Sequence, residues 1–195
     1  MGFVARAAFI ALTILAVACG GEGTPAGQEL EMYLFAHTGG QLEITFLKGR
    51  CCARIVVDAQ TEQARAAAVA FAETLAAAIP SDGSMPSTDD ELAALVPVAG
   101  SGAYADWVED TSLYPAGPTI ITTTAGDWAD GSVGPFDEAG FEAVAIEHYH
   151  SKTTQIHLNL ELVNLISTSA AQQAFHYRSP TAPDEPYWDR GERLH

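Results

Sequence analysis

Three histidines stand close together near the end of the chain, and their spacing could bind a metal. His148 and His150 are two residues apart, and His157 follows them. On an extended segment, residues two apart face the same side, so the first two imidazoles would point together. A neutral imidazole is a good zinc ligand, above all with carboxylates nearby. A zinc site needs three or more protein ligands, however, and the His-x-His pair supplies at most two.

If His150 binds zinc, other parts of the chain must supply the remaining ligands. The candidate partners are histidines and aspartates spread along the chain: His148, His37, Asp58, Asp127 and Asp130. The last two aspartates lack the fuller oxygen-ligand pattern of a calcium loop. A different interpretation needs no metal, and in it His150 is a hydrogen-bonded histidine at the end of a strand.

The elements expected around the histidines are a strand, a turn and a helix. Residues 140–146 form an apolar run that predicts a strand buried on both faces. We expect His148 and His150 in the turn that follows. A helix is predicted over residues 159–175, with Asn159 as its N-cap and Glu161 on its polar face.

Alternating apolar residues predict three strands in the first part of the chain. They cover residues 30–36, 42–47 and 53–57, and the turns between them indicate two consecutive hairpins. The alanine-rich segment 61–79 predicts a long helix, capped by Asp58 or Thr61.

The remaining elements complete an α/β pattern. A short helix is predicted over residues 91–96 and a β-branched strand over residues 119–124. Between them, Tyr104, Trp107 and Tyr114 could line a groove or cover the core. Strands interleaved with two long helices indicate the α/β class, as a single domain with a mixed β-sheet flanked by helices.

The composition limits the partners of the protein. The chain has 195 residues, enough for one domain with a sizeable core, and its formal net charge is −16. A surface this acidic repels phosphate backbones, so nucleic acid is not expected as a partner.

The first residues resemble a secretory leader. Arg6 precedes an apolar run that is too short to span a bilayer. The run ends in small residues before Cys19, as in a bacterial lipobox, where the cysteine is lipidated and becomes the mature N-terminus. We therefore expect a signal peptide over 1–18, a flexible tether over 19–28 and a lipid anchor in the membrane of the cell envelope. The alternative is an ordinary signal peptide with a chance cysteine.

Two adjacent cysteines, Cys51 and Cys52, remain in the expected mature chain. Neighbouring cysteines bridge only through a strained ring, and on a strand they point to opposite faces. We expect two unbridged thiols, or one thiol that pairs with a neighbouring molecule. A lone Cys-Cys pair is not a metal motif, because it lacks a second pair.

The segment GPFDEAGFEAVAIEHYHS, with the expected helix after it, is similar to the C-terminal part of the di-zinc aminopeptidases of peptidase family M 28. The matching positions include a Pro-Phe loop end, an Ala-Gly turn, a buried strand and a His-x-His-Ser turn: Pro135, Phe136, Ala139, Gly140, Ala143, His148, His150 and Ser151. The resemblance implies a central mixed sheet flanked by helices, with His150 at the position of a zinc ligand. The paired zinc ions of the family activate a water that attacks the N-terminal peptide bond of a substrate.

Other motifs of that family are missing from this chain. It has no Glu-Glu pair to supply a general base and a ligand, and Gly131, Ser132 and Val133 replace the expected Ser-Asp-His. The sequence therefore predicts a domain over 29–178 that resembles a shortened, degenerate zinc aminopeptidase, followed by an irregular tail over 179–195.

The function predicted from this pattern is non-catalytic binding of peptides or of another envelope protein. An active zinc metallo-exopeptidase is the alternative, with zinc held by His150 and some of the partners named above. A third interpretation is a structural lipoprotein of the envelope.

Overall fold

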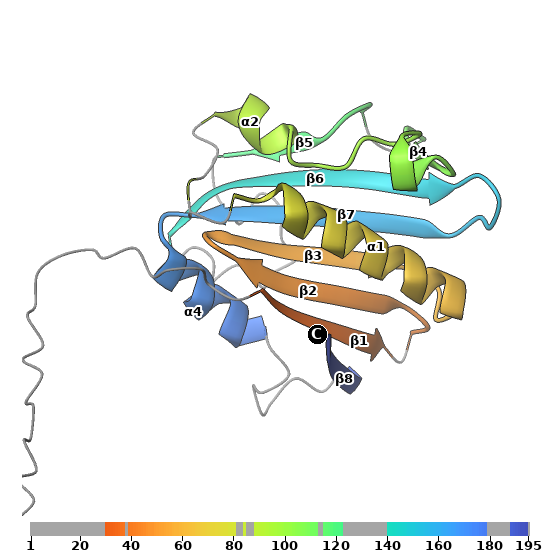
Figure 1. The fold of residues 1–195 in the computed structure, drawn as a ribbon, viewed down its shortest axis with the longest axis horizontal. Helices are drawn as coiled ribbons and strands as arrows, with labels where there is room; N and C mark the ends of the chain where they lie inside the picture. Colours follow the sequence, from red (N-terminus) through yellow and green to blue (C-terminus); the bar gives the residue numbers. More distant parts are fainter. Residues whose placement is uncertain are drawn as a thin grey trace, which may run out of the picture.

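The computed structural model describes residues 30–37, 39–80, 84, 88–112, 115–122, 140–178 and 188–194. They form one eight-stranded sheet with helices packed against it (Figure 1). The expected single α/β domain, a sheet flanked by helices, is therefore confirmed.

The first three strands form the two consecutive hairpins that the sequence predicts. The strands are β1 (Glu31–His37), β2 (Leu42–Lys48) and β3 (Cys51–Val57). Each pairs antiparallel with the next. Gly40 and Gly49 stand in the two turns with φ of 84° and 60°, a conformation that glycine adopts without a steric penalty.

The sheet places strands from both halves of the chain side by side. Its order is β4-β6-β7-β3-β2-β1-β8, and β5 also pairs with β6. The further strands are β4 (Trp107–Glu109), β5 (Thr119–Ile121), β6 (Phe141–Ser151), β7 (His157–Leu165) and β8 (Trp188–Leu194). Every pairing between described strands is antiparallel, so the parallel pairs of a mixed sheet do not occur among them. Parallel neighbours would need long crossover connections, whereas β1–β2–β3 and β6–β7 are joined by short turns.

Helix α1 (Glu62–Ala78) covers one face of the sheet (Figure 1). The hydroxyl of Thr61 accepts a hydrogen bond from the backbone N–H of Ala64 at 3.1 Å and so caps the helix, as expected. The short elements α2 (Asp89–Ala93) and η1 (Gly102–Tyr104) follow, and residues of both belong to the core on this face.

An aromatic cluster lies at the centre of this core. The ring of Phe71 lies 4.1 Å from Tyr104, 5.2 Å from Trp107 and 5.0 Å from Tyr149, measured between ring centroids. Tyr104 and Trp107 therefore cover the core rather than line a groove, whereas Tyr114 lies outside the described residues.

Helix α4 (Thr168–Arg178) packs on the opposite face. It forms a second apolar cluster with Cys52, while Cys51 belongs to the cluster under α1. Both cysteines are buried, and the Cys52 thiol donates to the backbone carbonyl of Ala171 at 3.2 Å. The two cysteines thus lie on opposite faces of the sheet, as expected, and the oxidation state of their thiols stays a prediction.

The helix predicted over 159–175 is wrong in its first half. Residues 157–165 are strand β7, and a helix begins only at Thr168. Leu158, Leu160 and Leu162 alternate with polar residues and are fully buried on one face, which is the period of a strand. Asn159 is therefore not an N-cap.

Two further expectations are corrected. His148 and His150 lie within strand β6, which runs to Ser151, and the turn begins only after it. The tail expected to be irregular contains strand β8, which pairs antiparallel with β1. Cys19, the tether, Asp127 and Asp130 lie outside the described residues. Within the described part of the chain, no helix has the length and apolar character needed to cross a membrane.

Candidate functional site

Two of the three clustered histidines meet at one end of the sheet. His150 on β6 lies directly opposite His157 on β7, and their ring centroids are 5.9 Å apart. His148 lies opposite Asn159 instead, with its Nδ1 2.7 Å from the side-chain oxygen of that residue. The strand alternation thus places all three imidazoles on the same face, where His150 lies beside His157 and His148 lies beside Asn159.

Two carboxylates surround His157. Its Nδ1 lies 3.2 Å from Oδ2 of Asp110, and its backbone N–H donates to Oδ1 of Asp58 at 2.9 Å. The hydrogen bonds from Ser112, together with the neighbouring His157, hold the pKa of Asp110 below its ordinary value. Asp58 therefore fixes the backbone where β3 and β7 meet, and Asp110 orients the imidazole of His157.

One ring nitrogen of His150 is buried. Its Nδ1 is shielded from solvent and makes no hydrogen bond with any of the residues that the structure describes. An unsatisfied buried polar atom costs about 1–3 kcal/mol. In the interpretation without a metal, His150 is a hydrogen-bonded histidine at a strand end, and the described residues supply no hydrogen bond to this one of its two ring nitrogens.

His37 lies at the same end of the sheet but far from His150. Four steps across the sheet separate β1 from β6, which is about 19 Å at the usual spacing of about 4.8 Å between strands. The Nε2 of His37 lies 3.2 Å from Oε2 of Glu43. His37 and His150 therefore do not share a ligand.

The described residues do not fit the zinc centre of an aminopeptidase. Nowhere in the described ranges do three or more His, Cys, Asp or Glu side chains form a group able to hold a metal ion. His150 and His157 offer two imidazoles, whereas a catalytic zinc site takes three protein ligands. Zinc binding stays a prediction, and the two remaining candidate oxygen donors, Asp127 and Asp130, lie outside these ranges.

A row of charged side chains crosses four strands on the same face. Arg54 on β3 lies between two carboxylates, 3.1 Å from Glu43 on β2 and 3.3 Å from Glu161 on β7. His37 extends the row to β1. Burial acts to raise the pKa of Glu43, but the hydrogen bond with His37 and the charge of Arg54 together hold it below its ordinary value.

Sequence reasoning missed this row. It placed Glu161 on a helix, where the residue could not face a strand partner. The alternation of leucines in β7 is the signal that would have put Glu161 on the face opposite the core, and the pairing of β3 with β7 then brings it to Arg54.

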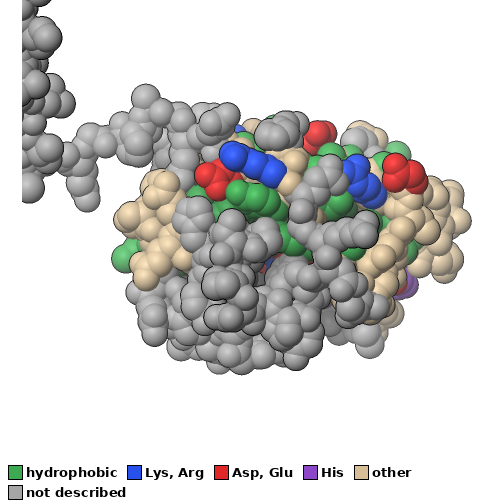
Figure 2. Space-filling model, turned by 90° about the horizontal axis from the view of Figure 1, so that it is seen from below, with side chains coloured by type: hydrophobic (Ala, Val, Ile, Leu, Met, Phe, Trp, Pro, Cys, Tyr) green, Lys and Arg blue, Asp and Glu red, His purple; other side chains and the backbone are tan. Residues whose placement is uncertain are grey.

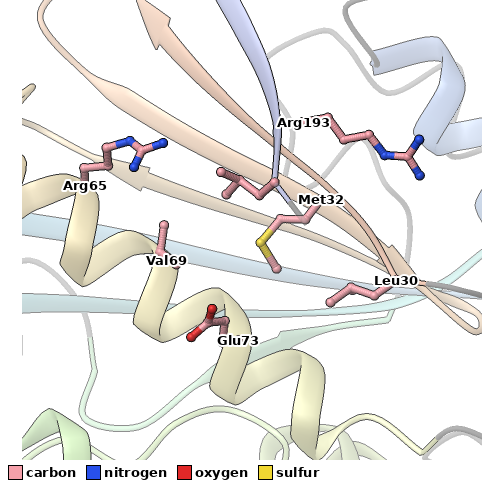
Figure 3. A pocket seen from close by; sticks show the side chains of 7 residues that line it. Leu30, Met32, Arg65, Val69, Glu73 and Arg193 are labelled. Atoms are coloured by element: carbon pink, nitrogen blue, oxygen red, sulfur yellow. The ribbon is translucent and has the colours of Figure 1, made fainter.

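A groove lies on the other face of the sheet, beside α1. It encloses about 370 Å³ and is lined by residues from the start of the described chain, β1, α1 and β8: Leu30, Met32, Arg65, Val69, Glu73, Arg193 and Leu194. Met32 on β1 lies on its floor (Figure 3), and Leu194 on β8, the cross-strand neighbour of Met32, also lines it. Arg193 contributes to the lining, but its guanidinium points away from α1.

The wall of the groove is one stripe of α1. Arg65, Val69 and Glu73 follow each other at intervals of four residues, so they lie along one side of the helix. Val69 thus stands between a positive and a negative side chain. From the β8 side, apolar side chains are visible between basic and acidic ones (Figure 2).

The groove could not be predicted from the sequence because the side opposite α1 is formed by residues of β8. Arg65 and Glu73 lie on the polar side of α1, and a polar helix side is ordinarily only a solvated surface, so these two residues gave no sign of a groove. The chain after residue 178 is rich in proline and gave no strand pattern. Only the pairing of β8 with β1 brings Leu194 beside Met32.

No protein-family model, no curated protein and no solved structure matches this chain. The resemblance to the zinc aminopeptidases thus remains a prediction from the sequence.

Proposed function

We propose that this protein is an exported, lipid-anchored domain that binds segments of other polypeptides in the groove between α1 and β8. The observation that carries this proposal is the groove itself. Its floor is apolar, and the charged side chains of Arg65 and Glu73 stand on its wall. An apolar surface with a few polar groups that fix orientation is typical of ligand sites.

The size of the groove supports a partner that inserts a few side chains. Its volume of about 370 Å³ is near the lower end of the range for ligand pockets, about 300–1,000 Å³. Burying one leucine-sized side chain contributes about 2 kcal/mol. The groove therefore supports reversible, modest-affinity contacts, such as those between neighbouring proteins of the envelope.

Export and lipid anchoring rest on the leader and on Cys19. A Cys19→Ser variant should lose incorporation of radiolabelled palmitate and should leave the membrane fraction. Palmitate labelling of this variant equal to that of the wild type would contradict the anchor.

Peptide binding can be measured by fluorescence anisotropy with labelled peptides that carry a central leucine. Val69→Asp places an extra negative charge in the apolar centre of the groove, and we expect it to weaken binding at least tenfold. The matched control is Val98→Asp, because Val98 is 69% exposed and does not line the groove. Equal losses in both variants, or no binding by any peptide of the set, would overturn the proposal.

A further inference from the structure

We infer that His150 and His157 together bind a divalent transition-metal ion, and that copper(II) is the ion they bind most tightly. Their chain neighbours Tyr149 and Leu158 belong to the core under α1, so the two imidazoles face the other side of the sheet. The site is therefore separate from the groove and does not rest on the proposed peptide binding. It also differs from the zinc centre expected from the sequence, because its second ligand is His157.

The two imidazoles are close enough to share one ion. His150 and His157 pair directly across β6 and β7, and their ring centroids are 5.9 Å apart. An imidazole nitrogen binds a transition metal at about 2.0 Å, so two rings that share one ion have centroids roughly 4.5–6.3 Å apart, depending on the angle at the metal. The observed separation falls within this range, so rotations of the two side chains suffice to bind an ion between them.

Asp110 orients His157 as a ligand. Its Oδ2 lies 3.2 Å from Nδ1 of His157, and an ionised carboxylate only accepts hydrogen bonds. In the neutral imidazole the proton is therefore on Nδ1, and the lone pair is on Nε2. Metal-binding histidines usually donate their other ring N–H to a carboxylate in this way, which fixes the ring and makes it a stronger ligand. The side chain of His157 is 50% exposed, so an ion from the solvent can reach it.

The ring of His150 is the second ligand. Its Nδ1 makes no hydrogen bond within the part of the chain that the structure describes, so no described donor competes with an ion for a lone pair on this nitrogen. The neighbouring His148 differs in this respect, because its Nδ1 lies 2.7 Å from the side-chain oxygen of Asn159. The pair of ligands is therefore His150 with His157, and not the His-x-His pair of the sequence.

Two imidazoles favour copper(II) over other divalent ions. Copper(II) binds nitrogen ligands more tightly than nickel(II) or zinc does, and it adopts a tetragonal arrangement in which water molecules can complete the ligand set. Zinc sites ordinarily take three or four protein ligands, which the described residues do not supply. The formal net charge of −16 attracts cations in general and so supports binding without selecting the metal.

The test is a titration of the full-length protein with copper(II), nickel(II) and zinc, followed by isothermal titration calorimetry in the presence of glycine, which suppresses weak binding elsewhere. Pulsed electron paramagnetic resonance of the copper(II) form counts the imidazoles bound to the ion. We expect one copper(II) per chain with two imidazoles, and weaker binding of nickel(II) and zinc. The resonance spectrum of the wild type needs no substitution, so it decides the ligand count even where a variant does not fold.

Three variants and a matched control identify the ligands. His150→Ala and His157→Ala should each weaken copper(II) binding at least a hundredfold and leave at most one bound imidazole. Asp110→Asn should weaken binding about tenfold and keep both imidazoles, because it changes only the group that orients His157. His148→Ala is the control, since it removes a histidine from the same strand and the same face, and it should bind copper(II) within about twofold of the wild type.

Several results would overturn the inference. They are a wild-type spectrum with fewer than two imidazoles, a loss for His148→Ala as large as that for His150→Ala, or binding that neither His150→Ala nor His157→Ala weakens. Zinc binding as tight as that of copper(II) would overturn the assignment of the metal. None of these results bears on peptide binding in the groove, which the Val69→Asp variant tests separately.

Discussion

Arg54 lies between two carboxylates that come from neighbouring strands. Its partner Glu43 is only 2% exposed, whereas Arg54 itself is 35% exposed. A carboxylate this deep in the protein needs a counter-charge, because desolvation disfavours its ionised form. Arg54 and His37 supply hydrogen bonds to it from both sides.

We expect Arg54→Met to lower the free energy of unfolding by about 3 kcal/mol. Removing one partner of a buried ion pair typically costs about 3–5 kcal/mol. The loss should lie at the lower end of this range because Arg54 is partly exposed. The change leaves Glu43 buried with His37 as its remaining basic contact. Urea denaturation followed by circular dichroism measures the loss.

The double variant Glu43→Leu/Arg54→Met provides the control. It removes the buried carboxylate together with its arginine, so it should be more stable than Arg54→Met alone. A single variant within about 0.5 kcal/mol of the wild type, or a double variant less stable than the single one, would contradict the structural role of the row.

Strand β7 shows how an element can be assigned to the wrong class. Its segment HLNLELVNL contains good helix formers, and the polar and apolar residues over 159–175 also divide into two faces at a helical period, which predicts a helix. The buried leucines recur at every second position, however, and a strand with one buried face needs that period. Pairing with both β3 and β6 then fixes the segment in the middle of the sheet.

Phe71 is one of the buried side chains through which helix α1 packs against the sheet. Phe71 is fully buried and contacts rings from η1, β4 and β6. The small alanines around it allow the helix to approach the strands closely.

Phe71→Ala should therefore lower the free energy of unfolding by about 3–5 kcal/mol, because it removes a large buried ring and leaves a cavity. Guanidinium denaturation, followed by tryptophan fluorescence, reports the change. Phe71→Leu is the control, since it fills part of the space and should cost about half as much. A loss below about 1 kcal/mol for Phe71→Ala would mean that the aromatic cluster contributes little to stability.

The whole molecule carries a formal net charge of −16, so acid affects it in two opposite ways. Protonation of exposed carboxylates first relieves mutual repulsion. At lower pH it also removes the charge of Glu43, whose pKa in the folded protein lies below its ordinary value of 4.5. A lowered folded-state pKa gives stability that is present above the unfolded pKa and is lost as the pH falls through the folded one.

We therefore expect the free energy of unfolding to fall below about pH 4.5. Asp106 and Asp110 also lower the free energy of unfolding as the pH falls, because hydrogen bonds lower their pKa values in the folded protein. Burial raises the pKa of Glu147, so protonation of Glu147 raises the free energy of unfolding instead. Urea denaturation at a series of pH values from 7 to 3 measures the change.

The Glu43→Gln variant tests the cause of the acid effect. It should be less stable than the wild type at pH 7, and its stability should fall less steeply below pH 4.5. Parallel curves for the two proteins would show that Glu43 is not responsible.

Local patterns in the sequence determined much of this fold. The first two hairpins, the long alanine-rich helix with its Thr61 cap and the opposite orientation of Cys51 and Cys52 follow from alternation, propensity and capping. These features depend on interactions between residues close in the chain, so a reader of the sequence can find them.

The tertiary structure alone decided which strands lie side by side. The charged row needs the pairing of β3 with β7, and the groove needs the pairing of β8 with β1. The strands of each pair lie about a hundred residues or more apart, and no local pattern encodes which strand becomes the neighbour of another. The sequence identified the histidines as candidate ligands. The order of strands in the sheet then places His150 beside His157 and about four strand spacings from His37.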